Sequence, residues 1–481
     1  MPMKDQPMRP EISPADLLQR FFGYDRFRGS QEKIIRHVMS GRHAMVVMPT
    51  GMGKSLCYQI PALANEPGDG RLVLVLSPLI ALMQDQVESL TRRGIEAALI
   101  NSSLDRETRS KRYAELASGH FRLVYVTPER FRKTEFREAL QNRSVSLLAV
   151  DEAHCVSQWG HDFRPDYSRL GEIRRWLGDP TTMALTATAT AECRRDIYRQ
   201  LEIQPDEIEL FHEGIDRPNL SIDVTPVWGD EDKLEAIETS LRHPRYQGGS
   251  VIVYFSLIKT LERFSDALLR RGVDHVCYHG DLPRDRRRKI QDQFMSSEVD
   301  VVLATNAFGM GVDKEDIRIV IHAETPGSIE AYYQEIGRAG RDNAPSLCQW
   351  VYDQDDLTIQ MQFIEWSTPG AAFYSRLSTL LTEQGEQCRA FGLEWMNERL
   401  QRVSRHDHRL ATAIAMLERH GVLAGPREPE CFEVCKSLPP SFLDDDYLSE
   451  KKRRDQQRLY AMVEFAAETG SRNDFLNRYF L

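Results

Sequence analysis

The sequence predicts an α/β protein in which two parallel sheets follow each other along the chain and a mainly helical region comes last. Three observations support this prediction. Apolar runs of strand length alternate with amphipathic stretches, a Gly-Lys-Ser loop follows the first of these runs, and a second series of runs repeats the pattern without that loop. Runs that are apolar at every position are typical of strands buried on both faces, as in parallel sheets covered by helices.

The first series indicates an α/β domain at residues 17–208, preceded by a tail at 1–16. Its expected strands are 45–47, 72–76, 123–126, 147–150 and 183–185. The second series indicates a similar domain at residues 209–350, entered through a linker at 211–218. Its expected strands are 251–255, 275–278, 301–304 and 319–321. Two such domains in series predict a ligand cleft between them.

Residues 351–481 lack apolar runs of comparable strength, and we expect a helical accessory region there. Leu410, Ile414 and Leu417 share one helix face, which Gly421 is expected to end. A winged-helix-like module and ordinary helical packing both explain this spacing, and we favour ordinary packing. The basic run at 451–454 is expected to be a solvated helix face.

Composition indicates a soluble globular protein. Of the 481 residues, 41% are hydrophobic and 28% are charged, and the start of the chain lacks an apolar signal region. We therefore expect a cytoplasmic protein without membrane insertion. The eight cysteines are scattered, as expected of reduced thiols. The net charge of −10 argues against uniform coating of nucleic acid but allows a local basic groove.

A phosphate-binding loop is predicted directly after the apolar run 44–48. A strand that breaks into a glycine loop and then a helix presents backbone N–H groups to phosphates, and a lysine there neutralises the β- and γ-phosphates. Met48 stands where the usual pattern has its first glycine. The predicted ATP-binding loop consists of Thr50, Gly51, Met52, Gly53, Lys54 and Ser55. An ordinary turn would explain this loop taken alone.

A second motif, 151–154, follows the apolar run 147–150 and favours ATP hydrolysis over an ordinary turn. Asp151 is placed to hold Mg²⁺ together with the Ser55 hydroxyl. Glu152 is placed to orient or deprotonate the attacking water, and we include His154 among the catalytic residues.

The chain from about 17 to 345 resembles the RecQ DNA helicases of helicase superfamily two. The resemblance is carried by ordered motifs at 22–31, 48–59, 77–83, 157–167, 185–189, 305–311 and 332–342. It implies that the two expected domains are RecA-like. It also implies that the protein uses ATP and Mg²⁺ and acts on single-stranded and partially duplex DNA.

The motif at 22–31 resembles the adenine-recognition motif of that family. The amide of Gln31 offers the donor and acceptor needed to read adenine N6 and N7, while Tyr24 and Arg28 offer flat faces for stacking. A helix-capping role is the alternative for Gln31. We also place Asp313 in the ATP site.

Arg338 and Arg341 lie three residues apart, so on a helix they would share a face and reach into the cleft. The resemblance implies that Arg341 is the arginine finger, with Arg338 beside it and Gln334 in the same motif. Such an arginine stabilises charge on the transferring phosphoryl group. The alternative is a surface ion pair with Glu335 or Asp342.

Aromatic and polar residues alternate after the acidic motif, and Tyr167 ends this stretch. Aromatic faces there would stack on unpaired bases and report DNA binding to Glu152, although core packing is the alternative. The predicted DNA-binding residues of this loop are Trp159, His161, Phe163 and Arg164. From the other motifs we add Ser77, Pro78, Thr305 and Asn306.

Two departures from the family pattern have predicted consequences. Ser471 occupies the position of the first cysteine of the family's zinc module, and Cys431 and Cys435 form the only close pair. Cys348 and Cys388 are too distant in sequence to complete a recognisable finger, so we expect no structural zinc. Gly29-Ser30 replaces the usual Pro-Gly, which is predicted to loosen the adenine pocket.

The predicted function is that of an ATP-dependent DNA helicase. The resemblance implies 3′ to 5′ movement along single-stranded DNA, and we expect a role in DNA repair or recombination. We also expect a nucleoid-associated monomer. An RNA helicase and an ATP-switched DNA clamp that does not unwind are the alternatives. The aromatic-rich loop argues against the RNA helicase.

Overall fold

The computed structural model describes residues 13–64, 70–101, 104–156, 167, 169–246, 248–309, 312–402, 407–424 and 433–481. The chain divides into two compact units. The first is built from residues 13–153, 169–187 and 194–214, and the second mainly from residues 215–481. Each unit is described by itself.

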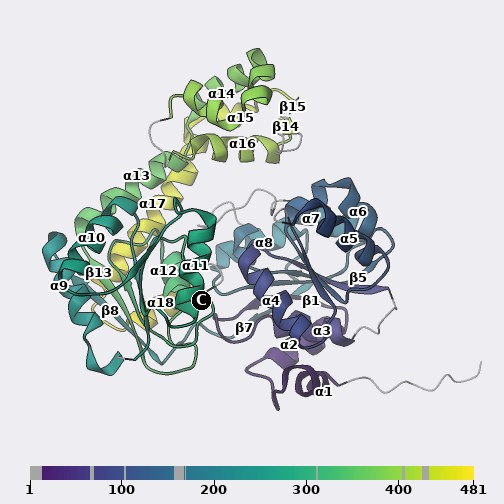
Figure 1. The fold of residues 1–481 in the computed structure, drawn as a ribbon. Helices are drawn as coiled ribbons and strands as arrows, with labels where there is room; N and C mark the ends of the chain where they lie inside the picture. Colours follow the sequence, from purple (N-terminus) through teal and green to yellow (C-terminus); the bar gives the residue numbers. More distant parts are fainter. Residues whose placement is uncertain are drawn as a thin grey trace, which may run out of the picture. The chain divides into compact units, whose positions relative to one another are not determined.

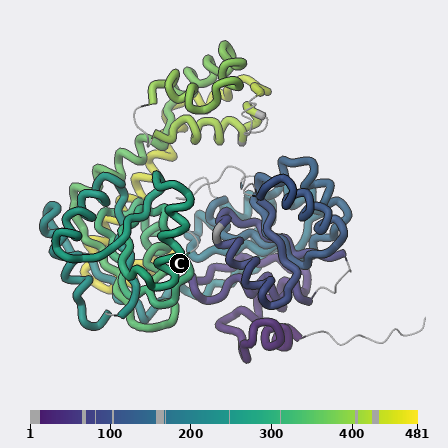
Figure 2. The backbone as a smooth tube through the Cα atoms, in the orientation of Figure 1, coloured from purple at the N-terminus to yellow at the C-terminus, as the bar shows by residue number. Residues whose placement is uncertain are grey.

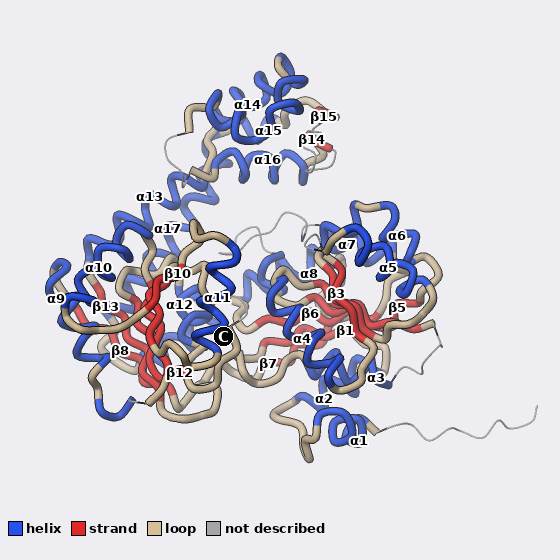
Figure 3. Tube along the Cα trace, viewed as in Figure 1, coloured by secondary structure: helices blue, strands red, loops and turns tan. Residues whose placement is uncertain are grey.

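A seven-stranded sheet forms the centre of the first unit, with the order β3-β4-β2-β5-β6-β1-β7 and parallel pairing throughout. Figure 3 shows these strands in red, with helices in blue around them. The strands are β1 His43–Val47, β2 Arg71–Leu76, β3 Ala97–Ile100, β4 Leu123–Val126, β5 Ser144–Val150, β6 Thr181–Thr186 and β7 Ile208–His212.

Two of the described helices precede the first strand, and others connect the strands, as parallel pairing requires. They are α1 Pro14–Leu17, α2 Gln31–Met39, α3 Leu56–Ala64, α4 Ile80–Arg92, α5 Arg106–Ala117, α6 Thr134–Leu140, α7 Leu170–Trp176 and α8 Ala191–Leu201 (Figure 1). A π-helical turn at Leu18–Phe22 and 3-10 turns at Pro128–Arg132 and Ala153–Val156 complete the set. Helices α2 and α3 pack against β1, β2 and β6 in one continuous apolar core.

The second unit contains a six-stranded parallel sheet with the order β10-β11-β9-β12-β13-β8. Separate apolar cores cover its two faces. Its strands are β8 Leu220–Pro226, β9 Ser250–Tyr254, β10 Val276–Tyr278, β11 Val301–Ala304, β12 Ile317–His322 and β13 Ser346–Tyr352. Its helices are α9 Gly229–Leu241, α10 Ile258–Arg270, α11 Arg284–Met295 and α12 Ile329–Ile336.

A helical segment follows the second sheet and then returns to it (Figure 2). The outgoing helix is α13 Leu357–Ser367, and the returning helices are α17 Asp445–Ala467 and α18 Arg472–Phe480. Met462 and Phe465 of α17 are fully buried in the same core as Trp350 of β13. Between them a small lobe with its own core contains α14 Ala371–Glu383, α15 Gly385–Arg399, α16 Arg409–Arg419, β14 Leu423–Ala424, β15 Glu433–Val434 and a 3-10 turn at Pro440–Leu443.

The predicted fold class is confirmed: two parallel-sheet domains precede a helical region. The linker prediction is wrong at its start, because residues 211 and 212 belong to β7 and Phe211 is buried in the first core. Leu410, Ile414 and Leu417 lie together in the lobe core, as their spacing predicted. None of the described helices is long and apolar enough to cross a membrane.

Candidate active site

The phosphate loop occupies the segment between β1 and α3. Met48 is fully buried, and its N–H donates to the Thr186 carbonyl oxygen at 3.0 Å, so the chain leaves the sheet only after this residue. Gly53 has φ +77°, and a Cβ there would lie 2.8 Å from Nε2 of Gln31. Glycine is therefore required at this position by both backbone conformation and space.

Lys54 places a positive charge in this loop. Its Nζ atom is buried and has no hydrogen-bond partner in the described part of the chain. A buried ammonium without a hydrogen-bonded partner is unfavourable, and an anion at this point would relieve the cost. The loop therefore fits the phosphates that the sequence predicts for it.

Asp151 and Glu152 follow the end of β5. Asp151 is 6% exposed, and its N–H donates to the Leu76 carbonyl oxygen at 2.8 Å. Burial, reinforced by the charge of Glu152, raises the pKa of Asp151 to about 7, while Lys54 acts in the opposite direction. A divalent cation beside Asp151 would favour its ionised form. The carboxylate therefore suits the predicted magnesium site.

Glu152 has an uncommon backbone conformation, with φ +47°, and its side chain is 8% exposed. Its N–H donates to Oδ1 of Asp151 at 3.0 Å. A non-glycine residue in the left-handed region is disfavoured, and such conformations cluster at functional sites. His154 follows in the 3-10 turn Ala153–Val156 and is buried.

Gln31 is the first residue of α2 and is 1% exposed. Its Nε2 donates to the carbonyl oxygens of Met52 at 2.7 Å and Gly53 at 3.0 Å, and its Oε1 accepts the N–H of Arg28 at 2.9 Å. Ser30 holds the N-cap position of α2. The Gln31 amide therefore braces the phosphate loop in this structure.

The two residues predicted to stack on the base lie on the loop before α2. Tyr24 is 50% exposed, as a ring that stacks on a ligand should be. Arg28 is exposed, and its Nη1 donates to the Gly51 carbonyl oxygen at 3.4 Å. Of the three proposed adenine contacts, Arg28 and Gln31 are hydrogen-bonded to the phosphate loop.

The arginine motif belongs to the second unit. The prediction that Arg338 and Arg341 lie on a helix is wrong, because α12 ends at Ile336 and both arginines follow in a turn. Gly337 is the C-cap residue of α12, and glycine commonly ends a helix. The helical spacing expected for residues 338 and 341 therefore does not apply. Gln334 lies on α12 itself and is half-buried.

Both arginines are held by oxygen atoms. Arg338 is buried and its Nη1 donates to the Gly309 carbonyl oxygen, while the Tyr254 hydroxyl donates to the neighbouring Phe308 carbonyl oxygen at 3.0 Å. Burial raises the pKa of Tyr254 to about 12, with Arg338 acting in the opposite direction. Arg341 forms an ion pair with Asp313.

The ion pairs considered as alternatives for the arginines are not formed. Glu335 contacts His322, with 2.7 Å between Oε2 and Nε2, and Asp342 pairs with Arg318. Burial lowers the pKa of Arg341, and its partner Asp313 acts in the opposite direction. Asp313, which we expected at ATP, is the residue that holds Arg341.

The described residues that were predicted to contact DNA differ in how far they are buried. Ser77 and Pro78 are buried at the end of β2, where the Ser77 N–H donates to the Val126 carbonyl oxygen at 3.2 Å. Thr305 is 7% exposed, and Asn306 beside it is exposed. Trp159, His161, Phe163 and Arg164 lie outside the described residues. Tyr167 is fully buried, as the core-packing alternative expects.

Arg217, in the predicted linker 211–218, and Asn219, directly after it, contact the arginine motif. Nη2 of Arg217 donates to the carbonyl oxygens of Ala339 and Gly340, both at 2.9 Å. Nδ2 of Asn219 donates to the Gly340 carbonyl oxygen at 2.8 Å. The polar residues at 216–219 were the sequence signal that could have indicated this contact. Arg217 and Asn219 hold the turn that carries both arginines.

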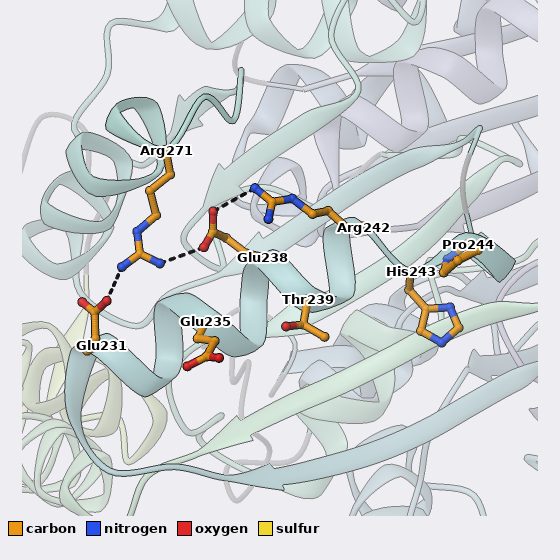
Figure 4. Close-up of a pocket in the computed structure, with 8 residues that line it drawn as sticks. All are labelled: Glu231, Glu235, Glu238, Thr239, Arg242, His243, Pro244 and Arg271. Carbon is orange, nitrogen blue, oxygen red and sulfur yellow. Dashed lines mark hydrogen bonds and ion pairs between the residues drawn. The ribbon is translucent and has the colours of Figure 1, made fainter.

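A hollow of about 590 Å³ lies along α9 and beside Arg271, which directly follows α10, and it is unrelated to these residues (Figure 4). Arg271 lies between two of its carboxylates, with 2.7 Å from its Nη1 to Oε2 of Glu238 and a second pair to Glu231. Both of its arginines are paired with carboxylates, and none of the predicted site residues lines it. The lining residues are Glu231, Glu235, Glu238, Thr239, Arg242, His243, Pro244 and Arg271.

Two family models match the chain. The DEAD/DEAH box helicase model matches residues 28–196, and the helicase conserved C-terminal domain model matches residues 232–343. The first range contains the phosphate loop and the acidic motif, and the second contains the arginine motif.

Curated relatives are similar over most of the chain. The ATP-dependent DNA helicase RecQ of Bacillus subtilis is 44% identical over 353 residues, which are 73% of this chain and 58% of that protein. The probable ATP-dependent DNA helicase RecS of the same organism is 41% identical over 72% of this chain and 68% of its own length. The chain thus spans less than two thirds of the matched RecQ protein.

Solved structures share the fold at low identity. Dbp5 of S. cerevisiae, bound to RNA and ADP BeF3, has a TM-score of 0.58 and 19% identity, over 73% of this chain and 90% of that chain. Helicase Lhr of Mycobacterium smegmatis, bound to ssDNA and AMP-PNP, has a TM-score of 0.55 and 17% identity, over 93% of this chain and 61% of that chain. At these identities the likeness is one of fold alone.

Proposed function

The chain belongs to the RecQ family of helicases, and from that premise we propose that it is an ATP-dependent DNA helicase. The observation that best supports this proposal is Lys54, whose buried Nζ has no hydrogen-bond partner among the described residues and lies in a loop next to the acidic pair 151–152. A structural lysine would be expected to have a partner or to reach solvent.

The site residues of the first unit named below then have these proposed roles in ATP binding and hydrolysis. Lys54 holds the β- and γ-phosphates, and Glu152 orients or deprotonates the attacking water. Mg²⁺ held by Ser55 and Asp151 would neutralise charge on the phosphates. Tyr24 and Arg28 stack on the adenine and Gln31 reads its edge.

The second unit supplies the proposed arginine finger. Arg341 would stabilise negative charge that develops on the transferring phosphoryl group, with Arg338 and Gln334 beside it. Arg217 and Asn219 hold the turn that carries both arginines.

The proposed substrate is single-stranded or partially duplex DNA, and movement is 3′ to 5′. Translocation would use backbone contacts, which carry little sequence information, together with base stacking on the loop at 157–167. Thr305 and Asn306 are the proposed contacts of the second unit, and Ser77 and Pro78 those of the first. We place the protein in the cytoplasm as a nucleoid-associated monomer that acts in DNA repair or recombination.

One strand-displacement assay separates this proposal from its alternatives. The substrates are a 3′-tailed DNA duplex, a 5′-tailed DNA duplex and a tailed RNA duplex, each incubated with ATP and Mg²⁺. We expect displacement of the 3′-tailed DNA alone, and none with Lys54→Ala. Displacement of RNA would support the RNA helicase, and ATP-dependent DNA binding without displacement would support the clamp.

We also propose that residues 351–481 hold no structural zinc. Ser471 is the N-cap residue of α18, and its Oγ accepts the N–H of Asp474 at 3.2 Å. Cys348 and Cys388 are buried in separate cores, where their thiols donate to backbone carbonyl oxygens. Cys435 is exposed, and Cys431 lies outside the described residues. Elemental analysis should find no stoichiometric zinc, and one zinc per chain would contradict the proposal.

A further inference from the structure

We propose that Glu213 is a positioning residue that sets the protein's preference for adenine by anchoring the loop 28–31. This inference rests on the proposed ATP-binding role of that loop. Glu213 lies directly after β7, at the edge of the sheet, 183 positions along the chain from the loop that it contacts. Glu213 lies outside all of the sequence motifs that predict the ATP site.

The contact between Glu213 and the loop has two parts. Oε1 of Glu213 accepts the N–H of Ser30 at 3.0 Å. Its other carboxylate oxygen lies so close to Gly29 that a Cβ at residue 29 would collide with it. The Glu213 backbone is itself fixed, because its N–H donates to the Val47 carbonyl oxygen at 3.0 Å, next to the end of β1.

The position of this carboxylate is also favourable electrostatically. Ser30 is the N-cap residue of α2, a helix of nine residues, so the Glu213 side chain lies at the helix N-terminus. Negative charge there interacts favourably with the helix dipole. The contact therefore has a hydrogen bond, a close packing contact and a favourable field acting together.

The groups proposed to recognise adenine depend on this loop. Arg28 precedes Gly29, and Gln31 follows Ser30. The N–H of Arg28 donates to Oε1 of Gln31 at 2.9 Å, so a shift of the loop moves both residues. An anchor on Gly29 and Ser30 consequently sets the positions of the stacking guanidinium and of the amide.

Gly29 makes the anchor possible. It has φ +48°, which a proline cannot adopt because its ring holds φ near −65°. The replacement of Pro-Gly by Gly-Ser led to the prediction of a looser pocket. In the structure Glu213 holds this loop by its contacts with Gly29 and Ser30. A carboxylate far away in sequence therefore restrains the loop in this chain.

The test compares steady-state ATP and GTP hydrolysis by the full chain and its variants, with DNA present. For Glu213→Ala we expect KM for ATP to rise roughly 5- to 20-fold, as for loss of a hydrogen bond to a charged acceptor. KM for GTP and kcat at saturating ATP should change less than twofold. Glu213→Gln retains an acceptor for the Ser30 N–H and should restore most of the ATP affinity.

Glu209→Gln is the matched control, because Glu209 lies on β7 and pairs with Lys33 of α2 without touching the loop. It should leave both KM values unchanged. Gly29→Ala should raise KM for ATP as Glu213→Ala does, because the new Cβ collides with the Glu213 carboxylate. In the double variant KM for ATP should rise by less than the product of the two separate rises, because the alanine then has no carboxylate to collide with.

The outcomes separate this inference from the proposed function. If the wild-type protein hydrolyses ATP but Glu213→Ala leaves KM for ATP unchanged, or raises KM for ATP and GTP equally, Glu213 does not set the adenine preference. If the wild-type protein hydrolyses no ATP, the proposed function itself is wrong. Melting temperatures of all variants, compared with wild type, show whether a loss reflects misfolding.

Discussion

Gln31 and Met52 are joined by a hydrogen bond of 2.7 Å from the Gln31 amide nitrogen to the Met52 carbonyl oxygen. The residue proposed to read the base is thereby connected to the loop proposed to hold the phosphates. Because Gln31 is also bonded to Gly53 and Arg28, its amide has two partners for Nε2 and one for Oε1. Reading adenine would require the amide to share or exchange these partners.

Replacing Gln31 by alanine should therefore affect base recognition and loop geometry together. We expect Gln31→Ala to raise KM for ATP at least tenfold, because two hydrogen bonds to the phosphate loop and the contact with the base are lost. The measurement is KM for ATP and for GTP. If both rise by the same factor, Gln31 only braces the loop and does not read the base.

Lys54→Ala should abolish hydrolysis and leave the fold intact. The Nζ atom of Lys54 has no hydrogen-bond partner among the described residues, so its removal breaks no such bond. We expect a DNA-stimulated ATPase rate below a few per cent of wild type and a melting temperature equal to or above it. Lys111→Ala, a change at an exposed residue of α5, is the control and should alter neither quantity. Retained hydrolysis would show that Lys54 does not serve the phosphates.

The sequence predicted the parts of the fold and site that depend on local pattern. Strands such as β1 and β2 are apolar at nearly every position and were located directly. β8 was not, because as an edge strand it is only partly buried. The phosphate loop is contiguous, so its residues were found by spacing.

Contacts between distant segments could not be read in the same way. Glu213 and Ser30 are separated by 183 positions, and Arg217 and Ala339 by 122. No periodicity or motif relates such pairs, and only the folded sheet brings them together. The same reason explains why the ion pair considered as an alternative for the arginines was one with Glu335 or Asp342, although Arg341 pairs with Asp313.

Lys233→Met should destabilise the second unit. Lys233 on α9 is 4% exposed, and its Nζ lies 2.5 Å from Oδ1 of Asp356, which is also buried. Removing one partner of a buried pair leaves the other charge uncompensated, at a cost of about 3 kcal/mol. The measurement is the denaturation midpoint. Arg263→Met breaks an exposed pair with Asp230 and should cost less than about 1 kcal/mol.

The loss caused by Lys233→Met should depend on pH. Burial raises the pKa of Asp356 to about 7, and Lys233 is the main group that opposes this rise. A folded-state pKa above the unfolded value means that the folded protein takes up a proton, so stability falls as pH rises through that range. Without Lys233 the pKa of Asp356 rises further, and the deficit should be larger at pH 8 than at pH 6. A deficit independent of pH would show that packing of the lysine stem, and not charge, is responsible.

Arg341→Ala tests the proposed arginine finger, and its structural surroundings make the result interpretable. The Asp313 side chain that pairs with Arg341 is 62% exposed, so removing the arginine leaves no buried unpaired carboxylate and should change stability by less than about 1 kcal/mol. If Arg341 stabilises the transferring phosphoryl group, kcat should fall by about 10³ or more while KM for ATP changes little. Arg341→Lys should recover only a small part of kcat, because a lysine lacks the planar pair of donors. Asp313→Asn provides the control for the ion pair: it should lower kcat far less than Arg341→Ala, since the guanidinium is retained. Equal losses of kcat and thermal stability in Arg341→Ala would instead assign Arg341 to holding the turn after α12.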